Sequence, residues 1–117
     1  MAYANRSQAR GILRDWAGAI ADADEAIRLE PKLAAARLNR GLARLNSGDA
    51  DGARSDFDEA IRLNPGLFGA WLGRGVARQK RGDIDGAIAD LARAVELAPP
   101  GSPQRADAER RLRELRR

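Results

Sequence analysis

The sequence predicts an all-α fold, a solenoid in which helical hairpins are stacked in series. The first observation is a period of 34 residues, which is typical of architectures whose units pack only on their neighbours. The second is that each period holds two segments with helical patterning and a break between them. Five sets of residues keep the spacing: Pro31, Pro65 and Pro99; Ala19, Ala53 and Ala87; Ala26, Ala60 and Ala94; Asp15, Asp49 and Asp83; Asp22, Asp56 and Asp90.

The second repeat shows how one hairpin is encoded. Residues 34–46 are rich in Ala, Leu and Arg, which favour helix. Gly48 suits the left-handed position after a helix end, and Asp49 is a good N-cap for the next helix. The apolar face of that second helix falls at a 3.6-residue period and consists of Ala53, Phe57, Ala60, Ile61 and Leu63. Pro65 then ends the helix, because proline disfavours helical geometry at the residue before it.

The other repeats follow the same pattern. The third has Gly82-Asp83 at its turn, an apolar face after it, and Pro99-Pro100-Gly101 at its end. The first has Arg14-Asp15 at the turn, without a glycine. Glycines or a serine lie midway along each first helix, and alanines lie opposite them on the second. We therefore expect the two backbones of a hairpin to approach closely.

An Arg–Asp spacing of 16 residues also recurs in each repeat. The pairs are Arg6 and Asp22, Arg40 and Asp56, and Arg74 and Asp90. The members of the second pair are equidistant from Gly48, so they lie level with each other in an antiparallel hairpin. We predict an ion pair inside each repeat, which contributes only about 0.2–1 kcal/mol if it is exposed. A row of arginines that binds an anionic ligand is the alternative, and we favour the structural pair.

Together these residues resemble the tetratricopeptide repeat, a 34-residue motif with small and aromatic residues at fixed positions. The matching residues are Tyr3, Ser7, Trp16, Ala19, Ala23, Ala26 and Pro31, then Gly41, Ala53, Phe57, Ala60 and Pro65, then Trp71, Gly75, Ala87, Leu91, Ala94 and Pro99. Arg37 and Ala50 depart from the motif at two aromatic positions. The resemblance implies a right-handed superhelical α-solenoid. We expect one domain, residues 1–117, with repeats 1–33, 34–67 and 68–101 and a capping helix in 102–117.

Composition argues against an enzyme. The chain has no Cys and no His, which removes thiol nucleophiles, His general bases and the common zinc sites. Asp49 with Asp51, and Asp83 with Asp85, sit at predicted helix N-termini, where negative charge favours the helix dipole. We therefore interpret these carboxylates as capping groups rather than catalytic ones, and expect no cofactor and no metal.

No apolar run approaches the 18 residues of a membrane helix, and we predict no membrane insertion. The chain shows no signal peptide, so the cytoplasm is the default expectation. Its first residues already belong to repeat one, which suggests a segment of a longer protein and leaves the localisation of that parent open.

The net charge of +4 is concentrated in the C-terminal tail. Residues 105–117 hold six Arg against three acidic residues, net +3, and the remainder holds 15 basic and 14 acidic residues, net +1. Ser102-Pro103 can start a helix, and Ala108, Leu112 and Leu115 form one apolar stripe. We interpret 103–115 as a helix that covers the apolar side of the last hairpin. Nucleic-acid binding through these arginines is the minority interpretation, and it predicts a steep salt dependence.

The resemblance implies a non-catalytic scaffold that holds a protein or peptide partner in a concave groove lined by the first helix of each repeat. Carried onto this chain, the groove positions are Ala4, Asn5, Gln8 and Ile12, then Leu38, Asn39, Leu42, Leu45 and Asn46, then Leu72, Val76, Gln79 and Lys80.

The groove positions suggest a kind of ligand. Leu38, Leu42 and Leu45 form an apolar stripe that Leu72 and Val76 continue, which suits an amphipathic helix or an extended peptide with hydrophobic anchors. The alternative is that these residues pack the first helix of one repeat against the first helix of the next. Asn5 and Asn39, one repeat apart, can hydrogen-bond a peptide backbone, or they are simply solvated.

Some domains of this family hold a partner's C-terminal carboxylate with Lys, Asn and Arg at defined groove positions. Only Asn39 matches here, because Ala4, Gly69 and Gly73 fill the basic positions. This argues against such a clamp. Self-association is the other open alternative, through the apolar edge of the first hairpin around Tyr3 and Trp16.

Overall fold

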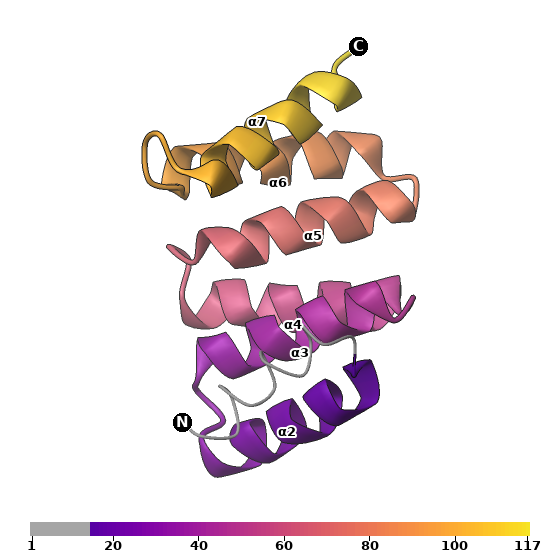
Figure 1. The fold of residues 1–117 in the computed structure, drawn as a ribbon, viewed down its shortest axis with the longest axis vertical. Coiled ribbons are helices and arrows are strands. Elements are labelled where there is room, and N and C mark those ends of the chain that lie inside the picture. The colour runs from indigo at the N-terminus through magenta and orange to yellow at the C-terminus, as the bar shows by residue number, and fades with distance from the viewer. Residues whose placement is uncertain (1–14) are drawn as a thin grey trace.

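The computed structural model describes residues 15–117, which contain six α-helices and no strand. The helices are α2 (Trp16–Leu29), α3 (Ala34–Asn46), α4 (Ala50–Leu63), α5 (Phe68–Lys80), α6 (Ile84–Leu97) and α7 (Pro103–Leu115). Each helix packs on the next in chain order, so the hairpins α3–α4 and α5–α6 are nested between α2 and α7 (Figure 1). The predicted all-α solenoid is confirmed, and the first helix expected in repeat one falls on residues outside the described range.

The turns form as the sequence predicts. Gly48 and Gly82 have φ of 99° and 83°, the left-handed conformation that glycine adopts without a steric cost. Asp49 Oδ1 accepts a hydrogen bond from the Gly52 amide at 2.9 Å, and Asp15 and Asp83 cap α2 and α6 in the same way. The glycine three residues after each cap was not predicted. A Cβ at Gly52 would collide with the Asp49 carboxylate, so glycine lets the cap approach the helix end.

Phe57 is the centre of the core between the second and third repeats. Its side chain is fully buried on α4, in a cluster with Leu45 and several alanines. A Cβ built on Gly41 of α3 would lie 2.7 Å from Phe57 Cε1, and one built on Gly73 of α5 would lie 2.5 Å from Phe57 Cζ. The ring therefore occupies space that two helices leave free by carrying glycine. The sequence analysis placed alanine opposite Gly41, whereas the structure places the Phe57 ring there.

The predicted Arg–Asp pairs form in the second and third repeats. Arg40 Nη2 lies 2.6 Å from Asp56 Oδ1, and Arg74 Nη2 lies 2.9 Å from Asp90 Oδ1. The side chains of Asp56 and Asp90 are only 3% and 2% exposed, so these pairs are not the weak surface pairs considered above. The pair expected at Arg6 and Asp22 lies partly outside the described residues.

Each of these arginines also reaches the preceding repeat, which was not predicted. Arg40 Nη1 contacts Asp24 of α2 at 2.9 Å, and Arg74 Nη1 contacts Asp58 of α4 at 2.9 Å. A second arginine also contacts each buried carboxylate. Arg44 pairs with Asp56 and Arg78 pairs with Asp90, both at 3.0 Å. We call this set of contacts the Arg–Asp ladder. It joins three consecutive helices at each step.

The expected capping helix is α7, which packs on α6. Ser102 caps it by accepting a hydrogen bond from the Arg105 amide at 3.1 Å, and Pro103 occupies its first turn. Ala108 is its buried residue, at 1% exposure. No helix within residues 15–117 is both long and apolar enough to cross a membrane.

Candidate functional site

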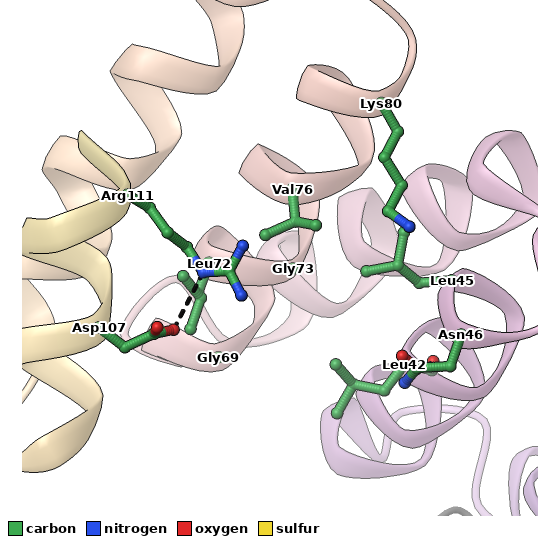
Figure 2. A pocket seen from close by; sticks show the side chains of 10 residues that line it. All are labelled: Leu42, Leu45, Asn46, Gly69, Leu72, Gly73, Val76, Lys80, Asp107 and Arg111. Carbon is green, nitrogen blue, oxygen red and sulfur yellow. Dashed lines mark hydrogen bonds and ion pairs between the residues drawn. The ribbon is translucent and has the colours of Figure 1, made fainter. Parts of the chain in front are cut away.

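A groove of about 460 Å³ opens between α3, α5 and α7. In Figure 1, α3 and α7 lie on the same side of the stack, with α5 between them in the chain order of the helices. The groove is lined by Leu42, Leu45, Asn46, Gly69, Leu72, Gly73, Val76, Lys80, Asp107 and Arg111 (Figure 2). Its volume is within the range of sites that hold ligands in other proteins, but the groove is open rather than enclosed.

Six of the predicted groove residues line this space together: Leu42, Leu45, Asn46, Leu72, Val76 and Lys80. Leu42 is 38% exposed, so much of its side chain is available for contact. Leu45 is 7% exposed and belongs mainly to the core around Phe57. Within the leucine stripe, Leu42 therefore faces the groove and Leu45 packs inside.

Three other predicted positions do not line the groove. Leu38 is partly buried and packs against the core, close to Gly69 of the next repeat. Asn39 and Gln79 are half-buried on α3 and α5. The predictions at Asn5, Gln8 and Ile12 lie outside the described residues, as does Ala4. Trp16, one of the two residues proposed for self-association, is half-buried at the start of α2.

Four lining residues were not among the predicted groove residues. Gly69 and Gly73 come from α5, where Gly69 is half-buried and Gly73 is buried with the Phe57 ring in the space beside it. Asp107 and Arg111 come from α7, which the sequence analysis treated only as a cap. They take the places that Leu72 and Val76 occupy on α5, at an offset of 35 residues rather than 34. The sequence signal that could have revealed them is the junction that contains Pro99-Pro100-Gly101-Ser102, which is one residue longer than the junctions before α3 and α5. It places α7 one residue later than the 34-residue period predicts.

The α7 side of the groove is held by ion pairs within that helix. Arg111 Nε donates to Asp107 Oδ2 at 3.0 Å, and Arg110 also pairs with Asp107. Burial alone would raise the pKa of Asp107, but the hydrogen bonds from Arg110 and Arg111 outweigh it and lower the pKa below its ordinary value. The folded-state pKa is therefore depressed. The resulting stabilisation is complete above the unfolded pKa of about 4 and is lost as the pH falls through the folded value.

No arrangement typical of metal binding occurs in the part of the chain that the structure describes, since residues 15–117 hold no group of three or more acidic side chains placed to bind an ion. Asp49 and Asp83 act as N-caps, and Asp51 and Asp85 lie in the first turns of α4 and α6. Asp49 and Asp83 therefore have the capping geometry that the sequence predicts, whereas Asp51 pairs with Arg81 at 2.9 Å. The chemistry available in the groove is apolar contact, hydrogen bonding and charge.

The family assignment follows from comparison with known proteins. A model of the tetratricopeptide repeat matches residues 6–68 and 43–103, which together span most of the chain. The chain belongs to the tetratricopeptide repeat family. A search of curated proteins gives no match.

Several solved structures share the fold closely. The TPR domain of OM64 from Arabidopsis is 28% identical, with a TM-score of 0.86 over 97% of this chain and 93% of that one. The first TPR of Spaghetti (RPAP3), solved bound to the HSP90 peptide SRMEEVD, is 23% identical with a TM-score of 0.88 over 98% and 88%. PcrH, solved with the chaperone binding region of PopD, is 17% identical with a TM-score of 0.89 over 97% and 88%. The fold is thus that of tetratricopeptide domains, which are protein-interaction modules.

Proposed function

We propose that this protein is a non-catalytic scaffold that binds a peptide or helix of a partner protein in the groove between α3, α5 and α7. The observation that carries the proposal is the convergence of one exposed and two half-buried apolar side chains from two repeats in one open groove. Leu42 comes from α3, and Leu72 and Val76 come from α5. Two proteins of similar fold were solved with peptide segments of their partners bound, which supports the same class of ligand here.

The groove suits apolar anchors of a peptide better than a small polar ligand. Gly69 carries no side chain and is half-buried, so a partner's side chain can approach the α5 backbone there, whereas Gly73 is buried against the Phe57 ring. Polar groups lie at its margins, on Asn46, Lys80 and α7. A site of this kind holds one or two hydrophobic side chains and leaves the rest of the peptide in contact with polar groups.

The test is a neutral polar substitution at Leu42. Leu42→Asn removes an exposed apolar contact from the groove without adding charge, and binding of groove ligands is expected to weaken about tenfold. The ligands are peptides selected on the wild-type chain from a random 12-residue display library, and their affinities are measured by fluorescence anisotropy.

The matched control is Leu29→Asn, because Leu29 is 55% exposed and lies on α2, away from the groove. Both variants are expected to keep the helical circular dichroism of the wild type. Selected peptides that bind Leu42→Asn and wild type equally well would place the binding site elsewhere.

A further inference from the structure

The charges that line the groove are unbalanced. Lys80 and Arg111 are the two cationic lining residues, and Asp107 is the one acidic residue among them. Asp107 is already held by both Arg110 and Arg111. Lys80 makes no ion pair within residues 15–117 and its side chain is exposed. The groove therefore presents uncompensated positive charge beside an apolar floor.

The two cations stand on different sides of that floor. Figure 2 shows Lys80 descending from the C-terminal end of α5 toward the side where Leu45 and Asn46 lie, and Arg111 reaching from α7 toward Leu72. A ligand whose apolar side chain rests on Leu72 and Val76 is then within reach of a cation on either side. Charge complementarity across such a site gives specificity more than affinity.

We propose that the groove selects an acidic-apolar peptide segment, in which an Asp or Glu within a few residues of the apolar anchor pairs with Lys80 or Arg111. This inference rests on the proposed function and adds the charge of the partner to it. A basic segment is disfavoured because it faces Lys80, and the carboxylate of Asp107 already has two partners. A purely polyanionic ligand leaves the apolar surface of Leu42, Leu72 and Val76 without a contact.

The same random 12-residue library provides the probe. Sequences enriched on the wild-type chain are expected to contain Asp or Glu near an apolar residue more often than the unselected library does. Replacing that acid by its amide in a synthetic copy is expected to weaken binding about two- to fivefold at low ionic strength. We call the affinity of the acid form divided by that of the amide form the acid-to-amide ratio. This ratio is expected to fall toward one in high salt, which screens exposed charges.

Two variants of the protein are expected to shift this ratio in opposite directions. Lys80→Gln removes one cation and should bring the acid-to-amide ratio closer to one. Asp107→Asn removes the carboxylate that holds Arg111 and should raise the ratio. Circular dichroism and thermal melts of both variants establish that they are folded. Lys80→Gln is the primary test, because Lys80 is exposed and has no ion pair in the described residues.

The outcomes separate the inference from the proposed function. Enriched peptides that depend on Leu42 but show no excess of acids, or bind acid and amide forms equally, would overturn the inference and leave the groove as the site. An absence of any Leu42-dependent peptide would overturn both. An acidic peptide without an apolar residue that binds as tightly as the selected ones would show a general polyanion surface, and that too would contradict the proposal.

Discussion

Among single residues, Phe57 shows most clearly how the chain builds a core with few aromatic residues. Its ring is fully buried between Gly41 of its own hairpin and Gly73 of the next one. Glycine in a helix normally costs about 0.5–1 kcal/mol relative to alanine. That cost is offset here by the burial of a large aromatic side chain at the junction of two repeats.

Gly73→Ala is therefore expected to destabilise the protein by about 1–3 kcal/mol, despite the better helix propensity of alanine. The added Cβ would lie 2.5 Å from Phe57 Cζ, so the fully buried ring would have to shift. Gly69→Ala is the matched control on the same helix, because its Cβ would meet the flexible end of Leu38 at 3.3 Å. Urea unfolding should place Gly69→Ala within about 0.5 kcal/mol of wild type.

A double-mutant cycle checks the cause of the effect. Leu91 occupies the place of Phe57 in the third repeat, so a leucine is an acceptable residue at this point of the fold. Phe57→Leu should make the cost of Gly73→Ala smaller, because the smaller side chain leaves room for the new methyl group. An unchanged cost in the Phe57→Leu background would show that the ring is not what excludes a side chain at Gly73.

Among the elements, α7 has two roles that depend on different faces. Its apolar face, with Ala108 at the centre, covers α6, and its charged face supplies Asp107 and Arg111 to the groove. Most of its charges are paired inside the helix, including Arg105 with Glu109 and Arg111 with Asp107. Part of the positive charge of the tail is therefore neutralised by ion pairs that stabilise the helix.

Ala108→Asp is expected to undock α7 from α6, because it places an uncompensated charge at a buried position, at a cost of about 2 kcal/mol or more. Amide hydrogen exchange should rise first in α7 and then in α6, with the earlier hairpin less affected. Ala106→Asp is the control, since Ala106 is exposed on the same helix. Equal protection of α7 in the two variants would contradict the packing described for Ala108.

On the scale of the whole molecule, the Arg–Asp ladder links the repeats into one unit. Arg40 and Arg74 each bind a buried carboxylate of their own hairpin and an exposed one of the hairpin before. The hydrogen bond with Asp56 raises the pKa of Arg40 above its ordinary value, which outweighs the opposite effect of its partial burial. Each buried carboxylate also accepts a hydrogen bond from a second arginine, Arg44 for Asp56 and Arg78 for Asp90.

The two kinds of carboxylate are expected to contribute very differently to stability. Asp56→Asn removes a charge that two arginines share at a buried position, and should destabilise the protein by about 2–4 kcal/mol. Asp58, the exposed partner of Arg74, has a side chain that is 49% accessible. Asp58→Asn should therefore cost at most about 1 kcal/mol. Thermal melts of the two variants, with the same chemical change, test this difference. A similar loss in both would show that burial does not decide the strength of the ladder.

The sequence was sufficient to predict the order of the described helices, the side-chain caps of α4, α6 and α7, the hairpin turns and the ion pair inside a repeat. These features depend on residues close to one another in the chain or at a fixed distance from a turn, as Asp49 and the Arg40–Asp56 pair illustrate. The contacts of Arg40 with Asp24 and of Arg74 with Asp58 were missed because they depend on how one hairpin sits on the next, which the 34-residue period does not specify.

The groove was predicted only in part for a related reason. Its α3 and α5 residues follow from the period, since Leu42 and Val76 occupy the same place in successive repeats. Asp107 and Arg111 do not, because the junction before α7 carries one additional residue. Whether Leu45 faces a ligand or the core depends on the exact rotation of α3, and the helical pattern alone leaves such a residue at the boundary between the two.

The position of Trp71 gives the molecule an intrinsic optical probe of the junction between its second and third repeats. Its indole Nε1 donates to the Pro65 carbonyl at 2.9 Å, and the Arg74 guanidinium lies 5.0 Å from the ring centroid. Arg74 in turn holds both Asp58 and Asp90. Separation of these two repeats therefore changes the polarity around the indole and shifts its fluorescence emission. The second tryptophan, Trp16, reports from the far end of the stack, so replacing either one by phenylalanine leaves a single emitter whose signal belongs to a known place.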